Sequence, residues 1–243
     1  LLIKGKSKQE ILISTYICHP SMANNELSGP LVSLMLVDHF QKQKKLEKTL
    51  RFIFVPETIG SIVFLHRNLK YLKKNVIGGY NLSCIGDERN HSCMLTKYKN
   101  KISDFALIEA YKKLKIKPKI YSFLHRGSDE RQYNSPGVDL PIASIFRTKY
   151  GEYPEYHTDA DNFDLVTADG LQGSFEVMTN IIKAFEFGLH PKTEVIGEPQ
   201  LGKRGLSPTL SKIGSRDNLM TMMDCLAYAD GQNTIFDIFY WLL

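Results

Sequence analysis

Apolar runs alternate with amphipathic stretches along most of the chain. Unbroken runs rich in β-branched residues predict buried strands, whereas apolar positions three or four residues apart predict helices. Predicted strands, four long and one short, fall at residues 11–17, 50–55, 76–85, 92–96 and 140–146. Predicted helices fall at residues 30–40, 59–72, 104–114 and 165–189. Because strands and helices alternate, the pattern predicts an α/β fold with a mostly parallel central sheet and helices on both faces.

The pattern changes after His190. The following Pro191 disfavours a helical conformation in the residue before it, and residues 197–208 are rich in Gly and Pro, as linkers are. Two short helical patterns follow, at residues 217–227 and 235–242. We therefore expect an α/β domain at residues 1–190 that lacks its N-terminal part. We expect residues 191–243 to form a linker and a truncated helical unit resembling a winged helix.

Composition restricts the class of protein. No apolar run approaches the roughly 20 residues needed to cross a bilayer, and no signal peptide is recognisable at Leu1. The four cysteines lack paired spacing, which favours reduced thiols and a cytoplasmic location. The net charge of +5 is modest, and the lysine clusters fall at predicted helix ends, where the helix dipole favours cations. These features disfavour membrane and nucleic-acid partners and leave a homo-oligomer open.

Two histidines follow predicted strands. His19 follows the first strand, with Asn25 and Glu26 a few residues later, and His157 follows the last strand. Open α/β sheets bind ligands at the carboxyl ends of their strands, so these side chains could converge on a metal ion that prefers N and O ligands. A single histidine after a strand is more often a hydrogen-bonded structural residue. The metal hypothesis therefore depends on both histidines.

Acids accompany the histidines. Glu57 ends the second strand, where a carboxylate facing a metal can act as a general base, although an acid at a helix N-terminus is an equal alternative. Asp87 ends the third predicted strand and is a weaker ligand candidate. Asp129 and Arg131 lie in one loop and could orient a ligand or hold the substrate, or could form a loop ion pair. Asp159 and Asp161 could cap the helix that follows them.

Other catalytic motifs are absent from the sequence. The chain has no GxSxG elbow, no P-loop and no GxGxxG motif. A serine hydrolase is therefore disfavoured, and the same holds for proteins that bind nucleotides through these motifs.

Four stretches in order along the chain resemble the M28 zinc aminopeptidase superfamily. They are residues 19–29, 54–61, 127–133 and 156–161. They resemble most closely its bacterial branch of aminopeptidase-like proteins (DUF4910 or DUF2172 type), often encoded beside polysaccharide-biosynthesis genes and carrying a C-terminal winged helix. Residues 197–206 resemble the lead into that winged helix. The resemblance implies that His19 and His157 bind metal, that Glu57 is the general base, and that Asp129 forms hydrogen bonds around the site.

The chain departs from the family pattern at three acidic positions. Asn25 stands where the family has an aspartate that bridges two metals, although Glu26 beside it could substitute. Thr58 and Ser83 stand at the other two positions, with Asp87 four residues after Ser83. Amides and hydroxyls are poor zinc ligands, so we expect one zinc ion bound by the two histidines and an acid rather than two ions.

The sequence therefore predicts a zinc-dependent hydrolase of the aminopeptidase type that acts on peptide or amide bonds. The alternative is a catalytically degenerate relative that binds an amino acid, a peptide or an amino sugar in connection with polysaccharide biosynthesis. The three replaced acids favour this alternative. A third class, a regulator that binds nucleic acid through the C-terminal unit, has some support from Lys203, Arg204 and Lys212.

Overall fold

The chain divides into two compact units. The structure is a computed structural model that describes residues 1–43, 45–186, 191–206 and 215–233, together with Ile235, Ile238 and Leu242. The first unit is Leu1–Glu186 and the second is Phe187–Leu243. All of the acids and histidines named as site candidates lie in the first unit.

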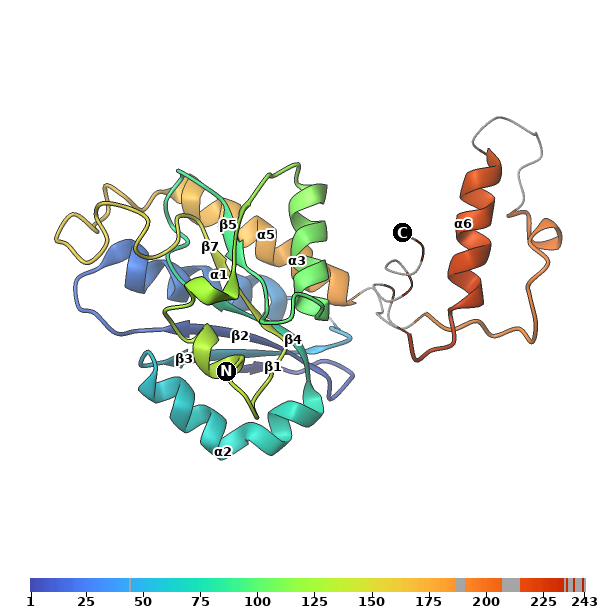
Figure 1. The fold of residues 1–243 in the computed structure, drawn as a ribbon, viewed down its shortest axis with the longest axis horizontal. Helices are drawn as coiled ribbons and strands as arrows, with labels where there is room; N and C mark the ends of the chain where they lie inside the picture. The colour runs from blue at the N-terminus through green and yellow to red at the C-terminus, as the bar shows by residue number, and fades with distance from the viewer. Residues whose placement is uncertain are drawn as a thin grey trace. The chain divides into compact units, whose positions relative to one another are not determined.

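The described residues of the first unit form a seven-stranded sheet in the order β1-β3-β2-β4-β7-β5-β6 (Figure 1). Its strands are β1 (Leu2–Ile3), β2 (Glu10–Tyr16), β3 (Thr49–Val55), β4 (Val76–Leu82), β5 (Ser92–Met94), β6 (Lys119–Tyr121) and β7 (Ile142–Phe146). Strands β2, β3, β4 and β7 run parallel, β1 is antiparallel to β3, and β5 is antiparallel to β7. The sheet is therefore mixed and mostly parallel, which confirms the predicted fold class.

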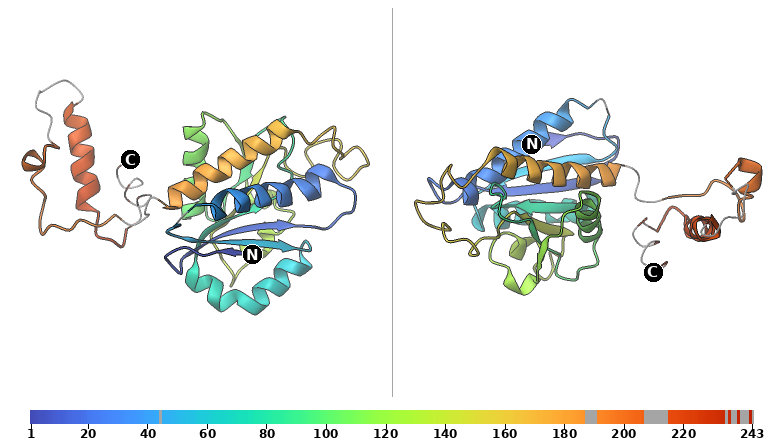
Figure 2. Two further views of the ribbon diagram at one scale, coloured as in Figure 1. Left: turned by 180° about the vertical axis from the view of Figure 1, so that it is seen from behind. Right: turned by 90° about the horizontal axis from the view of Figure 1, so that it is seen from above.

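Helices cover both faces of this sheet (Figures 1 and 2). One face carries α1 (Ser28–Gln41), α3 (Ile102–Lys113) and α5 (Ala168–Glu186), and both α1 and α3 pack against α5. The other face carries α2 (Ile59–Asn75) and the short helix α4 (Glu130–Tyr133), which contact each other. The sequence placed the start of α5 three residues too early, because the Thr167 hydroxyl accepts the Gly170 N–H (3.0 Å) and caps the helix there.

The continuous apolar run of β2 reflects its place in the sheet. Helices cover both faces of a central parallel strand, so its inward and outward side chains are both apolar. Ile11 and Ile13 are fully buried on one face. On the other face, Leu12 joins a core cluster beneath α2 that includes Ile53, Leu65, Leu72, Tyr133 and Ile142. This burial holds the carboxyl end of β2 in a fixed place.

Helix α1 begins close behind the ends of β2 and β4. A single π-helical turn, η1 (Ala23–Leu27), leads into it. A Cβ atom at Gly29 would lie 2.3 Å from the Thr15 Oγ1 and 2.6 Å from the Leu82 carbonyl oxygen. Only glycine permits this approach, which fixes the segment after β2 against the edge of the sheet.

The second unit is small in its described part. It contains the short turn η3 (Gly202–Arg204), the helix α6 (Ser215–Ala227) and a bridge between Lys192 and Asp230. The helix predicted at residues 217–227 is confirmed as α6. The helix predicted at 235–242 lies largely outside the described residues, as does the predicted end of α5 at residue 189.

Two further findings concern the helices and the cysteines. Within the described ranges, helices fall short of the length and apolar character that a membrane span requires. All four cysteines lie among the described residues and are free thiols, with Cys84 and Cys93 buried.

Candidate active site

His19 and His157 lie together at the carboxyl edge of the sheet. The first follows β2, and the second lies in the loop between β7 and α5. Their ring centroids are 4.3 Å apart and their planes are tilted by 49°. Tyr156 stacks on His157 with a centroid distance of 3.9 Å and an interplanar angle of 20°. The structure therefore brings together the two histidines singled out in the sequence, and an aromatic ring holds one of them in place.

Glu26 orients His19. Its side chain is buried, and it accepts hydrogen bonds from the backbone N–H of Cys18 and from the Asn25 Nδ2 (2.5 Å). Its Oε1 lies 3.1 Å from the His19 Nδ1. An ionised carboxylate only accepts, so Nδ1 donates and Nε2 is the nitrogen left to bind a ligand. A carboxylate that holds a histidine in this way fixes its tautomer and the direction of its free nitrogen.

The amide of Asn25 is engaged at both ends. Its Nδ2 donates to Glu26, and its Oδ1 lies 3.5 Å from the Tyr16 hydroxyl and 3.5 Å from the Cys84 sulfur. An amide is a poor zinc ligand, and this one is already used within the protein. The position where the family resemblance expects a metal-bridging aspartate is therefore built here as a hydrogen-bonded structural position.

Two neighbouring acids form the other side of the site. The Ser128 hydroxyl donates to the Glu57 Oε1 at 2.6 Å. The Asp129 Oδ1 accepts from the Thr58 backbone N–H (2.7 Å) and the Ser61 hydroxyl (2.8 Å), whereas its Oδ2 is buried with no partner among the described residues. Burial raises the pKa of Asp129 to about 6, and the nearby charge of Glu57 adds to the rise.

The charges of Glu57 and Glu26 both act on Tyr156, whose ring stacks on His157. Burial raises the pKa of Tyr156 to about 12, and the charges of Glu57 and Glu26 contribute to the rise. Tyr16 pairs in register with Val55 at the carboxyl ends of β2 and β3, so His19 and Glu57 follow neighbouring strands at the same edge of the sheet.

The backbone has a positive φ at two positions of this site, 61° at Thr58 and 59° at His157. A positive φ is sterically unfavourable for the β-branched Thr58, and such strain is concentrated at functional sites. Arg131 holds the strained segment, because its Nη2 donates to the Thr58 Oγ1 (3.0 Å) and its Nε to the Ser128 carbonyl (3.1 Å). Arg131 thus links Thr58, the residue after Glu57, to Ser128, whose hydroxyl donates to Glu57.

Asp161 joins the His157 loop to the turn that follows His19. Its Oδ1 accepts from the Asn24 N–H (2.5 Å), and its Oδ2 accepts from the Asn25 N–H (3.1 Å) and the Tyr153 hydroxyl (3.1 Å). The hypothesis that Asp161 caps the following helix is wrong, because it caps η1 instead. Sequence reasoning missed this role because Asn24 lies 137 residues earlier in the chain.

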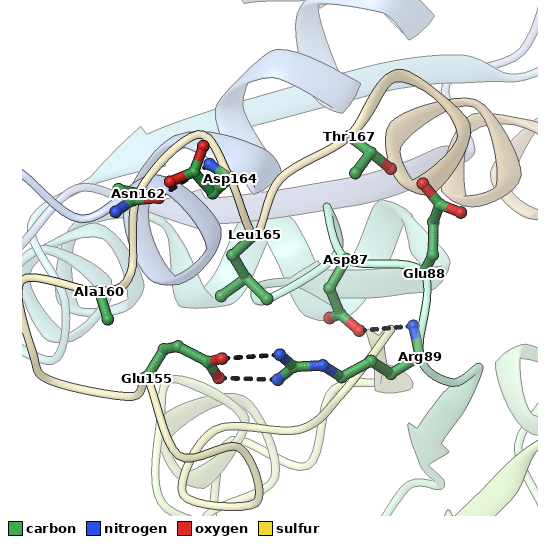
Figure 3. A pocket seen from close by; sticks show the side chains of 9 residues that line it. All are labelled: Asp87, Glu88, Arg89, Glu155, Ala160, Asn162, Asp164, Leu165 and Thr167. Carbon is green, nitrogen blue, oxygen red and sulfur yellow. Dashed lines mark hydrogen bonds and ion pairs between the residues drawn. The ribbon is translucent and has the colours of Figure 1, made fainter.

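Asp87 lies in a neighbouring cavity of about 390 Å³ (Figure 3). Its carboxylate accepts from the Thr148 N–H (2.9 Å) and hydroxyl (2.7 Å), the Arg89 N–H (3.0 Å) and the Asn24 Nδ2 (3.1 Å). Both oxygens are therefore used to fasten this loop. The sequence also extended the preceding strand too far: β4 ends at Leu82, and Cys84 follows with φ of 50°.

The site offers few donors that suit a metal ion. Throughout the described ranges, no group of three or more His, Cys, Asp or Glu side chains is arranged to hold one. The imidazoles of His19 and His157 are nitrogen donors suited to zinc. Ser83, at another expected acidic position, presents a buried hydroxyl without a partner among the described residues. Two imidazole donors are present for one ion, and the amide of Asn25 and the hydroxyl of Ser83 are poor zinc ligands at expected acidic positions.

A mostly parallel sheet with paired histidines and acids at its carboxyl edge defines an aminopeptidase-like α/β domain. Residues 1–187 match the family described as "Domain of unknown function (DUF4910)", and residues 190–241 match the winged helix-turn-helix family. The chain therefore belongs to the DUF4910 family and carries a C-terminal winged helix.

Two relatives come from Clostridium acetobutylicum. A "putative polysaccharide biosynthesis protein with aminopeptidase-like domain" is 37% identical over 246 residues, which cover 98% of this chain and 55% of the relative. The crystal structure of a "putative peptidase" has a TM-score of 0.82 at 34% identity and covers 100% of this chain and 54% of that chain. The chain thus spans about half the length of these relatives.

A more distant likeness extends to a zinc aminopeptidase from Bacillus subtilis. Its crystal structure has a TM-score of 0.64 at 17% identity, over 76% of this chain and 48% of that chain. At this level of identity the likeness concerns the fold, which is that of aminopeptidases.

Proposed function

We propose that the protein is a metal-dependent hydrolase of the aminopeptidase type that cleaves peptide or amide bonds and uses one zinc ion. The observation that carries the proposal is the pair of imidazoles, 4.3 Å apart, at the edge of the sheet where ligands bind. His19 Nε2 and His157 would hold the ion. When bound, zinc would polarise the substrate carbonyl and activate water.

Glu57 acts as the general base in this proposal. The Ser128 hydroxyl holds its Oε1, which leaves Oε2 to accept a proton from the attacking water and pass it to the leaving amine. Arg131 keeps the Glu57 loop in place through Thr58 and Ser128. Glu26, Glu57 and Asp129 together make the site acidic, which favours a substrate with a terminal ammonium group. Asp129 is fully buried, so it contributes to this charge without touching the substrate.

Glu57→Gln tests the assignment of the base. We expect zinc content to stay unchanged and hydrolysis of aminoacyl-p-nitroanilides to fall at least about 10²-fold, as when a general base is lost. The measurements are metal content by mass spectrometry and the initial rate of hydrolysis. Glu155→Gln is the matched control, since Glu155 pairs with Arg89 in the neighbouring cavity and activity should be retained (Figure 3). Full activity of the Glu57 variant would show that another group is the base.

The second candidate function is binding without catalysis. It is favoured by one observation: Asn25 stands at an expected ligand position with its amide engaged by Glu26 and near Tyr16. The protein would then recognise an amino acid, a peptide or an amino sugar. The amino sugar is suggested by the name of the relative linked to polysaccharide biosynthesis. Purified protein that takes up no added zinc but binds one of these ligands would favour this function.

Asn25→Asp tests whether the site has lost a second metal position. An aspartate supplies a carboxylate oxygen, which is a better zinc ligand than an amide. If the site has lost a second metal position, we expect the variant to bind more zinc per chain than the unmodified protein, measured by mass spectrometry after equilibration with zinc. Unchanged stoichiometry would argue that this position never held metal in this protein.

We place this function in the cytoplasm, because four free thiols are compatible with a reducing compartment. We propose no nucleic-acid partner for the second unit. The sequence of helix α6 contains Arg216 together with Asp217 and Asp224.

A further inference from the structure

A second pocket lies at the amino ends of β5 and β6. It has a volume of about 450 Å³ and is lined by residues 88–91 and 116–119. Three of its lining residues are cations, Arg89, Lys117 and Lys119, and one is an acid, Glu88. Because β5 runs antiparallel to β7, this pocket opens at the edge of the sheet where β7 ends, which is the edge where open α/β sheets bind ligands.

A buried arginine stands behind this pocket. Arg147 follows β7, is 6% exposed, and places its Nη1 2.5 Å from the Nε2 of His91, which lines the pocket. A guanidinium only donates, so Nε2 of His91 accepts and the ring proton sits on Nδ1. Burial, and then the charge of Arg147, lower the pKa of His91 to about 4. His91 is therefore neutral at pH 7 and has one N–H, at Nδ1, to offer.

The charge of Arg147 has no contact partner of opposite sign. Among the described residues, no carboxylate forms an ion pair with it, and its buried Nε has no hydrogen-bond partner. Asp87 and Glu88 favour its charged form only through space. Charged groups that leave water are ordinarily paired, since desolvation is otherwise uncompensated. An unpaired guanidinium behind a cationic pocket is the arrangement expected of a site for an anion.

The cations at the mouth of the pocket differ in availability. Arg89 is held by both oxygens of Glu155, and Lys119 lies 3.0 Å from Glu152. Lys117 is exposed and has no partner within the described part of the chain. Lys117 is therefore the rim residue whose charge is free to meet a ligand.

We propose that this pocket binds the phosphate or diphosphate group of a small molecule, with His91 as a donor at its base, the positive charge of Arg147 behind His91, and Lys117 at its rim. Guanidinium and ammonium groups together are the usual partners of phosphate oxygens. The volume accommodates a diphosphate together with part of the group it is attached to. This site is separate from the histidine pair and independent of the proposed hydrolysis.

Titration of the full chain with pyrophosphate tests the proposal, by isothermal calorimetry at low ionic strength. We expect saturable binding of one pyrophosphate per chain. Lys117→Glu should weaken it at least about tenfold, the effect of losing one charge-assisted hydrogen bond. Lys113→Glu, the same change at an exposed position on α3 outside the pocket, should leave it nearly unchanged. His91→Phe should also weaken binding, while its ring still packs near Tyr111 and thermal unfolding reports an intact fold.

Three results would overturn the proposal. The first is the absence of saturable pyrophosphate binding. The second is an equal loss in Lys117→Glu and Lys113→Glu, which would indicate diffuse attraction to surface charge. The third is loss of binding in His19→Ala, which would place the anion at the histidine pair. Retention of binding in His19→Ala together with its loss in Lys117→Glu supports the pocket.

Discussion

Asp129 is a buried acid beside a second acid. Its Oδ1 is satisfied by Thr58 and Ser61, but its Oδ2 has no partner among the described residues. Both burial and the charge of Glu57 therefore favour its protonated form, and its pKa rises to about 6. Near neutral pH this buried carboxyl is therefore close to the midpoint of its titration.

The raised pKa makes the stability of the protein depend on pH. Between about pH 4 and 6 the folded protein binds more protons at Asp129 than the unfolded chain does, so the free energy of unfolding falls as pH rises. Above about pH 6 the free energy of unfolding is lower by roughly 3 kcal/mol than it would be if Asp129 had its ordinary pKa in the folded protein. Asp129→Asn keeps the acceptor for Thr58 and Ser61 without the charge, so we expect its stability relative to the unmodified protein to increase from pH 4 to pH 7.

Urea unfolding at a series of pH values measures this difference. Asp38→Asn is the control, because the ion pair with Lys42 places the pKa of exposed Asp38 below its ordinary value. Its stability difference should therefore be constant above about pH 5. A difference for Asp129→Asn that does not change with pH would contradict the raised pKa.

Residue types predicted part of the site, but tertiary contacts decided the rest. His19 and His157 could be paired from sequence because both follow strands that end at the same edge of a sheet. The orienting role of Glu26 could not be predicted, because it depends on a buried turn that brings its carboxylate to the His19 Nδ1. The place of Asp87 after a predicted strand made it a candidate metal ligand. In the structure its oxygens accept hydrogen bonds from Thr148, Arg89 and Asn24 instead. The metal roles stay predictions.

At the scale of elements, the site depends on how the turn η1 meets the loop after β7. The two carboxylate oxygens of Asp161 accept hydrogen bonds from the N–H groups of Asn24 and Asn25, and one of them also accepts from the Tyr153 hydroxyl. These bonds fix the separation of the segments that carry the two histidines. Asp161 is therefore a positioning residue for the histidine pair, without contact to either ring.

Asp161→Asn should weaken both the fold and the metal site. An amide presents one acceptor where the carboxylate presents two, so we expect a loss of about 1–2 kcal/mol in the free energy of unfolding, as for other helix caps. We also expect zinc affinity to fall, because the imidazoles are no longer held at their present separation. Asp159→Asn, an exposed change two residues earlier in the same loop, is the control. Equal zinc affinity in the two variants would limit Asp161 to a stabilising role.

The long strands were predictable and the short ones were not. The apolar runs at β2, β3 and β7 are long enough to identify from composition alone, and β5 was predicted as a short strand. The strands β1 and β6 have two and three residues, and their pairing with β3 and β5 is set by neighbours far along the chain. The π-turn η1 buries Asn24, Asn25 and Glu26, a polar set that no pattern of hydrophobic positions would place inside.

At the scale of the molecule, the proposed chemistry is contained in one of two units. The first unit has its own sheet and a core on each face, and it holds every candidate site residue. The two family matches also meet between residues 187 and 190.

We therefore predict that residues 1–190 fold alone and bind zinc with the affinity of the whole chain. A unit that buries its own apolar core does not need the second unit for stability. Circular dichroism during heating and a zinc titration of both proteins measure this, with His19→Ala in the short protein as the control for specific binding. Loss of zinc affinity or of cooperative unfolding on removing residues 191–243 would contradict it.

The contact between Asp161 and η1 also bears on when the site forms. Closing a loop of 137 residues is entropically costly, so this contact forms only once intervening elements have already folded. We expect the histidine pair to be among the last features to assemble, after β7 has docked beside β4. A chain still emerging from the ribosome would contain His19 long before His157. It would therefore pass through most of its synthesis unable to capture zinc at this site.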